Sequence, residues 1–137
     1  MNPTGPIIII EADPDEVELL RDAIFQVGCT REVIVLTDPI DAINSLKIQK
    51  KPFMILCNIS MHGVNGFSLR KAILDDEELT WKCRPFLFYA ALGSEKDRKQ
   101  VFDLGAHGYL HGINDFGVLV DTLRTAIKYW ELSETIH

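Results

Sequence analysis

The segment Ile7–Glu16, which reads IIIIEADPDE, decides the fold class of this 137-residue chain. Its first four residues form an unbroken β-branched run, which is typical of a strand buried on both faces of a parallel sheet. Asp13 suits the N-cap of a helix, Pro14 suits the first helical position, and Glu16 completes a capping box. The segment therefore predicts a buried strand that passes directly into a helix.

The same alternation of short apolar runs and amphipathic stretches continues to the end of the chain. Further strands are predicted at residues 32–36, 53–57, 86–89 and 108–111. Helices are predicted from Asp38-Pro39, over residues 67–74, from Ser94 to Gly105, and after a cap at Asn114 or Asp115. Residues 58–66 are expected to form a loop and residues 75–84 a polar connection.

Five strands alternating with five helices predict an α/β fold, a flavodoxin-like (βα)5 doubly wound parallel sheet with strand order 2-1-3-4-5. Ligands of such sheets bind beyond the carboxyl ends of the strands, at the point where the strand order reverses. We therefore expect residues 11–13, 58–66, 90–93 and 111–114 to meet at one edge of the sheet.

The composition predicts one domain over residues 1–137, with short tails at residues 1–5 and 133–137. Lys and Arg number 14 against 20 Asp and Glu, a net charge of −6, which argues against nucleic acid or an anionic membrane as partner. Cys29, Cys57 and Cys83 lack CxxC spacing and are interpreted as reduced thiols of a cytoplasmic protein. Every unbroken apolar run is far shorter than a membrane span requires, so we expect no membrane span.

Three segments, Ile7–Pro14, Asn58–Phe67 and Leu104–Leu110, carry a resemblance over nearly the whole chain. With them the chain resembles the receiver domain of bacterial two-component response regulators, the CheY-like superfamily. The early Glu-x-Asp-Pro-Asp and the closing Lys128–Glu131 are most similar to single-domain, phytochrome-partner-type response regulators. The resemblance implies phosphoryl transfer from a histidine kinase to an aspartate at the end of the third strand, beside a divalent cation.

Several positions that carry this chemistry in the family are substituted here. The phospho-acceptor position holds Asn58, whose amide cannot act as the carboxylate nucleophile. The hydroxyl position after the fourth strand holds Ala90, and the lysine position after the fifth holds Gly112. The resemblance therefore implies a degenerate pseudo-receiver without a catalytic residue, and we expect no enzymatic activity.

The cation site implied by the resemblance is reduced to a vestige at Glu11, Ala12, Asn58 and Ser60. Ala12 replaces one of two cation-organising carboxylates, whereas Ser60 still offers its backbone carbonyl. Magnesium prefers hard oxygen ligands in a strict octahedron, and too few remain. We expect no bound Mg²⁺, no other metal and no other cofactor.

Aromatic residues in the last third of the chain suggest a switch and an interface. Tyr109 aligns with the family's switch aromatic, although Ala90 offers no hydroxyl to couple it to a phosphoryl group. The face of the fourth helix, fifth strand and fifth helix is the family's usual partner surface, and here it would include Phe102, Phe116, Tyr129 and Trp130. It is a candidate homodimer interface as well.

These observations predict a receiver-like module of two-component phosphorelay signalling that is not phosphorylated and acts by binding a histidine kinase or another response regulator. Two alternatives remain open. A functional receiver could use a rerouted acceptor such as Ser60, with His62 and His111 as further candidates. A pseudo-receiver could instead bind a small molecule in the more apolar hollow at the sheet edge.

Overall fold

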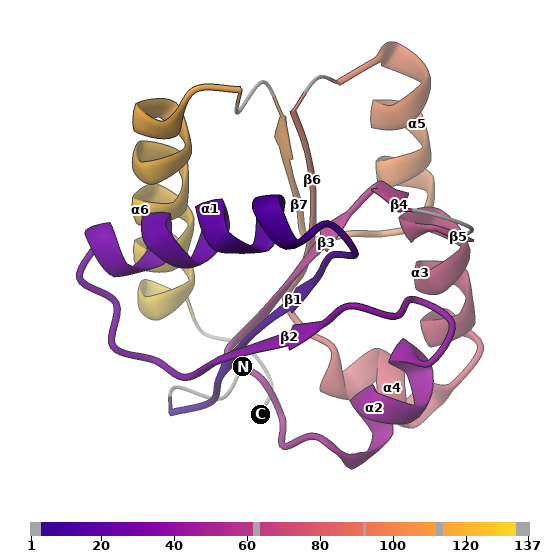
Figure 1. Cartoon of the computed structure of the whole chain (residues 1–137). Coiled ribbons are helices and arrows are strands. Elements are labelled where there is room, and N and C mark those ends of the chain that lie inside the picture. Colours follow the sequence, from indigo (N-terminus) through magenta and orange to yellow (C-terminus); the bar gives the residue numbers. More distant parts are fainter. Residues whose placement is uncertain (1–3, 62–63, 92, 112–113, 134–137) are drawn as a thin grey trace.

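A five-stranded parallel sheet forms the centre of the computed structural model, which describes residues 4–61, 64–91, 93–111 and 114–133. Its strands are β1 (Ile7–Ile10), β2 (Val33–Leu36), β3 (Met54–Asn58), β6 (Phe86–Ala90) and β7 (Gly108–His111). They lie in the order β2-β1-β3-β6-β7 (Figure 1). Counted within the sheet, this is the predicted order 2-1-3-4-5, and the flavodoxin-like fold is confirmed.

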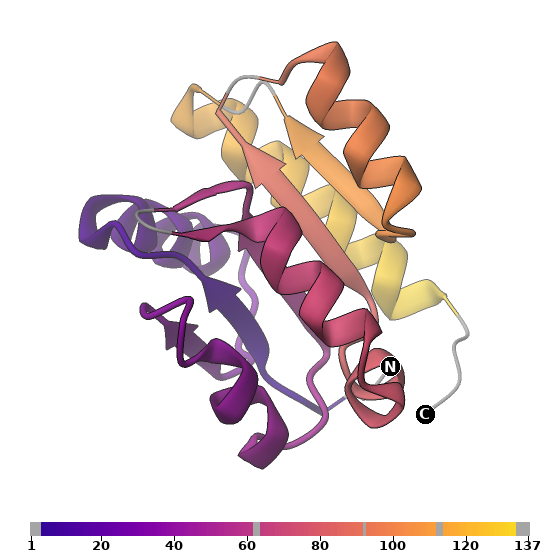
Figure 2. The ribbon, with the colours of Figure 1, turned by 90° about the vertical axis from the view of Figure 1, so that its right-hand side faces the viewer.

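Helices cover both faces of the sheet. Helices α1 (Pro14–Gln26) and α6 (Phe116–Leu132) lie on one face, and α2 (Ala42–Ile48), α3 (Gly66–Leu74) and α5 (Glu95–Asp103) lie on the other (Figures 1 and 2). Strand β1 contributes to the hydrophobic core on each face of the sheet, because Ile7 and Ile9 pack towards α1 and α6 while Ile8 and Ile10 face the opposite side. All four isoleucines are fully buried, as the continuous apolar run predicts.

The turn from β1 into α1 confirms the predicted cap and corrects the predicted capping box. The Asp13 carboxylate accepts the Asp15 amide at 2.9 Å, and Pro14 occupies the first turn. A capping box would give the Asp13 amide to Glu16, but this amide donates to Glu11 at 3.4 Å instead. The Asp13 amide therefore donates to Glu11 and not to Glu16, the partner that the capping box predicted.

Two segments predicted as irregular contain short elements. The expected loop after β3 holds a small antiparallel pair, β4 (Ser60–Met61) and β5 (Val64–Asn65). The expected polar connection holds α4 (Glu77–Lys82), which forms because Asp76 accepts the Leu79 amide and the Leu79 side chain is buried.

The remaining helix starts differ slightly from expectation. The second helix begins at Ala42, because the Asp38 carboxylate first closes a turn with the Ile40 amide at 2.9 Å. Asp115, not Asn114, caps α6 by accepting the Val118 amide at 3.1 Å. No helix in the described ranges is both long and apolar enough to span a bilayer.

Candidate functional site

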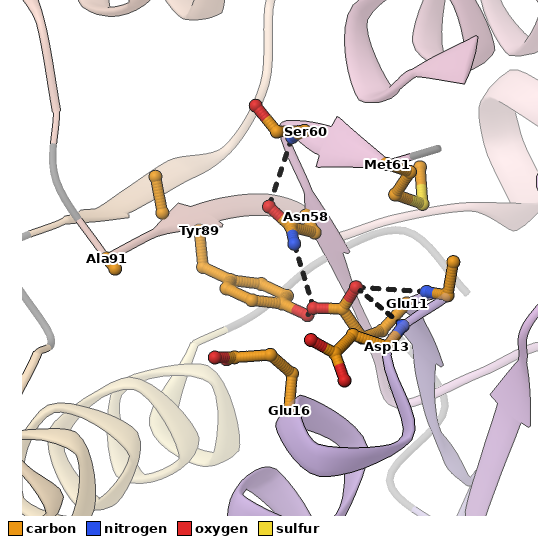
Figure 3. A pocket seen from close by; sticks show the side chains of 10 residues that line it. Glu11, Asp13, Glu16, Asn58, Ser60, Met61, Tyr89 and Ala91 are labelled. Carbon is orange, nitrogen blue, oxygen red and sulfur yellow. Dashed lines mark hydrogen bonds between the residues drawn. The ribbon is translucent and has the colours of Figure 1, made fainter. Parts of the chain in front are cut away.

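The carboxyl ends of β1, β3 and β6 surround a hollow of about 650 Å³ at the predicted edge of the sheet (Figure 3). Asn58 pairs with Tyr89 across the sheet, and Glu11 follows Ile10, which pairs with Cys57. The hollow is lined by Glu11, Ala12, Asp13, Glu16, Asn58, Ser60, Met61, Tyr89, Ala90 and Ala91. The structure therefore brings together five of the predicted positions, at residues 11, 12, 58, 60 and 90, whereas Gly112 and His62 lie outside the described residues.

The Glu11 carboxylate is the centre of this site, and its side chain is buried. Its Oε1 accepts the Asn58 side-chain amide at 2.8 Å and the Tyr89 hydroxyl at 2.7 Å. Its Oε2 accepts the backbone amides of Ala12 at 2.9 Å and Asp13 at 3.4 Å. Each oxygen thus has two donors from the chain itself, which compensates the cost of burying a negative charge.

Asn58 uses both ends of its side-chain amide. The amino group donates to Glu11, and Oδ1 accepts the Ser60 backbone amide at 3.1 Å. An ionised aspartate offers only acceptors and could not make the first of these bonds. The asparagine therefore joins the end of β3 to the end of β1 through a hydrogen bond that needs no bridging cation.

Tyr89 belongs to the site but was missed by the sequence reasoning. It is the penultimate residue of the buried strand β6, and its hydroxyl completes the donor set around Glu11. Burial, followed by the hydrogen bond to Glu11 and that residue's charge, raises the pKa of Tyr89 well above its ordinary value, so the phenol stays protonated as a donor. The available signal was a single hydroxyl within the otherwise apolar strand Phe86–Ala90.

Two further acidic residues, Asp13 and Glu16, line the hollow. Asp13 caps α1. The Glu16 pKa is raised, first by burial and then by the charges of Glu11, Asp13 and Asp15. Within the described part of the chain, no three His, Cys, Asp or Glu side chains form a group suited to a metal ion.

Residues 7–124 of the chain match the family model of the response regulator receiver domain. The chain belongs to this family. It is a response regulator receiver of two-component signalling, and receivers as a class are signalling modules that contact histidine kinases or other response regulators. The resemblance predicted from the sequence is confirmed.

Solved structures share this receiver fold at low sequence identity. The phosphorylated cyanobacterial phytochrome response regulator RcpA matches with a TM-score of 0.82 at 18% identity, covering 96% of each chain. The Mn²⁺-bound form of response regulator Rcp1 matches with a TM-score of 0.80 at 18% identity, covering 97% of this chain and 99% of that one.

A third similar structure comes from Pseudomonas aeruginosa PAO1. It is the receiver domain of a sensor histidine kinase with a magnesium ion in the active-site cleft, with a TM-score of 0.74 at 20% identity, covering 94% of this chain and 98% of that one. No curated protein sequence matches this chain.

Tyr109, the residue predicted to hold the switch position, lies on β7 with its ring against the core on the α3 side of the sheet. Its hydroxyl is buried without a hydrogen-bond partner among the described residues. A Cβ added at Gly93 would lie 2.8 Å from this hydroxyl, so the glycine makes room for it. The His111 ring stacks at 4.9 Å from the Tyr109 ring, and the predicted hydroxyl partner position holds only the Ala90 methyl.

The predicted interface aromatics of this receiver do not form one patch. Phe102 on α5 is 77% exposed. Phe116 lies at the start of α6 beside Leu19. Tyr129 and Trp130 lie near the other end of α6, about 20 Å along the helix, where they line a groove of about 560 Å³ against β7. The prediction placed these residues on one face, whereas in the structure they lie on α5 and near the two ends of α6.

Proposed function

We propose that this receiver does not accept a phosphoryl group at position 58 and acts by binding other signalling proteins. The observation that carries the proposal is the hydrogen bond from the Asn58 amide to the buried Glu11 carboxylate, at 2.8 Å. The acceptor position is thus occupied by a donor that is already engaged within the chain.

The chemistry at this position supports the proposal. Phosphorylation of a receiver requires a carboxylate oxygen to attack phosphorus while the donor's imidazole leaves, and a neutral amide oxygen is a poor nucleophile. Phosphoryl transfer also depends on neutralising the charge that spreads over the equatorial oxygens. Ala90 and Ala91 line that side of the hollow and offer methyl groups only.

The residues present do not fit a magnesium ion. Both Glu11 oxygens already accept two hydrogen bonds each, and Ala12 has no ligand atom. The Asn58 amino group points at Glu11, so a cation between the two side chains would meet a donor instead of an oxygen. Magnesium pays a high dehydration cost and needs several oxygen ligands to offset it. We therefore propose that this receiver binds no magnesium ion at this site and does not carry out phosphoryl transfer there.

The proposed activity is protein binding, with a histidine kinase or another response regulator as partner. The groove between β7 and the end of α6 supports this, because Tyr129 is 61% exposed beside the ring of Trp130. Exposed aromatic residues next to an apolar groove are typical anchors of protein interfaces. A homodimer through α5, β7 and α6 would use the same groove.

The test is incubation of the purified receiver with a small phosphodonor, phosphoramidate, and Mg²⁺, followed by intact mass measurement. We expect no gain of a phosphoryl group, whereas a receiver with aspartate at this position, treated in parallel, should gain one. An adduct that is lost in Asn58→Ala would overturn the proposal, whereas one that is retained in Asn58→Ala and lost in Ser60→Ala would establish the rerouted acceptor instead.

A further inference from the structure

Five basic residues gather at the edge of the sheet opposite the candidate site. They come from two segments that precede β3 and β6: Lys47, Lys50, Lys51, Lys82 and Arg84. These segments begin in the last turns of helices α2 and α4, which lie near each other at the amino ends of the strands (Figure 1). In a chain with a net charge of −6, this is a local reversal of sign.

Side-chain contacts join the two segments. Lys82 Nζ donates to the Lys47 carbonyl at 3.0 Å, and Lys51 Nζ donates to the Trp81 carbonyl at 2.9 Å. These carbonyls lie in the last turns of α2 and α4, where oxygens lack a partner within the helix and attract cations. The basic side chains are therefore held at defined places by the backbone.

Four of these five basic side chains lack an ion pair within the described part of the chain. Lys47, Lys50, Lys82 and Arg84 form no ion pair with a carboxylate of the described residues. Burial, followed by the charge of Arg84, lowers the pKa of Lys51, which indicates that the cations are close enough to repel one another. Such a cluster creates a local positive potential that attracts negatively charged groups.

Two apolar side chains lie exposed among these cations. Ile48 is 84% exposed at the end of α2, and Trp81 is 44% exposed on α4. The Arg84 guanidinium lies 5.1 Å from the centre of the Trp81 ring, which orients the indole at the surface. Trp and Arg are the residue types that most often dominate protein interfaces.

We propose that Lys47, Ile48, Lys50, Trp81, Lys82 and Arg84 form a docking surface for an acidic segment of a partner protein that carries an apolar or aromatic side chain. The lysines and Arg84 would face its carboxylates, and Ile48 with Trp81 would contact its apolar group. The surface lies away from Glu11 and Asn58, so the proposal does not depend on the state of the phospho-acceptor position.

Charge complementarity favours a short acidic protein segment over a nucleic acid. Asp75, Asp76, Glu77 and Glu78 border the surface at the start of α4 and would repel a long, evenly charged phosphate backbone. A protein segment spaces its carboxylates and brings its own apolar contact. The net charge of −6 disfavours an acidic partner elsewhere on the molecule and would direct it to this edge.

The experiment titrates the whole receiver into a fluorescently labelled short peptide of Glu and Asp with two Phe residues, followed by anisotropy. Comparison probes are the same peptide with Gln for each acid, the same peptide with Ala for each Phe, and a single-stranded oligonucleotide of equal charge. We expect saturable binding that is tightest for the acidic Phe peptide and weakens with added salt.

The variant Lys47→Glu/Lys50→Glu should weaken this binding about tenfold. Its matched control is Lys96→Glu/Lys99→Glu, which makes the same charge change at exposed positions of α5 and should leave affinity within about twofold. Thermal unfolding of both variants confirms that they are folded. In a Trp130→Phe background, the fluorescence of Trp81 should change on binding and so place the peptide at this surface.

Three results would overturn the proposal: no saturable binding of the acidic Phe peptide, equal weakening by both double variants, or tighter binding of the oligonucleotide than of any peptide. Phosphorylation of the receiver in the mass experiment would leave all of these measurements unaffected, so the two proposals fail separately.

Discussion

The two edges of the parallel sheet differ in whether their charged side chains find partners within the chain. At the carboxyl edge, the buried Glu11 carboxylate receives four hydrogen bonds from its own chain. At the amino edge, Lys47, Lys50, Lys82 and Arg84 have no carboxylate partner among the described residues. A charge that is satisfied internally contributes to folding, whereas a charge left at the surface remains available to a partner. The buried charge of Glu11 therefore has a structural role, whereas the cations at the opposite edge have the proposed binding role.

The largest effect should come from Glu11→Ala, which tests whether the carboxyl edge holds the strands together. The substitution leaves the Tyr89 hydroxyl, the Asn58 amide and two backbone amides without their acceptor. We expect the free energy of unfolding to fall by about 3 kcal/mol, measured by urea denaturation. Glu18→Ala, at an exposed position of α1, should change the free energy of unfolding by less than about 0.5 kcal/mol. Equal effects of the two variants would contradict a structural role of the Glu11 carboxylate.

Asn58→Asp should destabilise the protein by about 2 kcal/mol at neutral pH without Mg²⁺, because the new carboxylate cannot donate to Glu11 and repels it. Stability should recover as the pH falls, since a protonated acid regains a donor. Asn65→Asp is the matched control, because Asn65 caps α3 through Oδ1 and aspartate caps equally well. No loss of stability in Asn58→Asp would show that repulsion at this edge is unimportant.

Tyr89→Phe isolates one of the four donors around Glu11. The hydroxyl donates to a buried charge at 2.7 Å, and its removal should lower the free energy of unfolding by about 1.5 kcal/mol. Tyr129→Phe removes a hydroxyl from a 61% exposed ring and should leave stability nearly unchanged. If chemical denaturation finds Tyr89→Phe as stable as the control, the hydroxyl is not part of the internal charge network.

The smallest effect concerns His107, which precedes β7 at the amino edge. Burial, followed by the charges of Arg70 and Arg84, lowers its pKa to about 4, and its neutral Nδ1 accepts the Phe86 amide at 2.9 Å. The unfolded imidazole takes up a proton near pH 6.5. The stabilisation is therefore complete above that pH and is lost as the pH falls towards 4.

For this half-buried ring we expect a loss of about 1 kcal/mol over that range, followed by urea denaturation at a series of pH values. His107→Gln should flatten this part of the pH dependence, because the glutamine side chain can accept the Phe86 amide without titrating. His111→Gln, at an exposed position, should leave the profile unchanged. A profile equally steep in His107→Gln would contradict the neutral ring.

Much of the site could be predicted because parallel strands end at a common edge. Once Ile7–Ile10 and the strands ending near residues 58 and 90 were recognised, Glu11, Asn58 and Ala90 had to lie together. The sequence shows Asn58 and Ala90 directly, and the resemblance implies an aspartate and a hydroxyl residue at these two positions. The hydrogen bond of Tyr89 was not, because no local pattern tells whether a strand tyrosine turns its hydroxyl to a carboxylate 78 residues away.

Other features depended on contacts that sequence patterns do not contain. Helix α4 was missed because its single buried residue, Leu79, gives no helical period. The helix is stabilised instead by the packing of Leu79 against the core. The capping box failed because Glu11 competes for the Asp13 amide. The basic surface was missed because its members lie in two segments, around residues 47–51 and 82–84, that meet only through α2 and α4.

The sequence by itself determined the alternation of strands and helices that predicts the parallel sheet, and the asparagine at position 58, where the resemblance implies an aspartate. These follow from apolar periodicity, capping residues and side-chain identity, which are local properties of the chain. Only the tertiary structure decided that the Glu11 carboxylate is hydrogen-bonded within the chain. It also decided that the cations of residues 47–51 and 82–84 lie together at the opposite edge of the sheet. Partners far apart in sequence meet only after folding, and hydrogen bonds and charge interactions act only at short range.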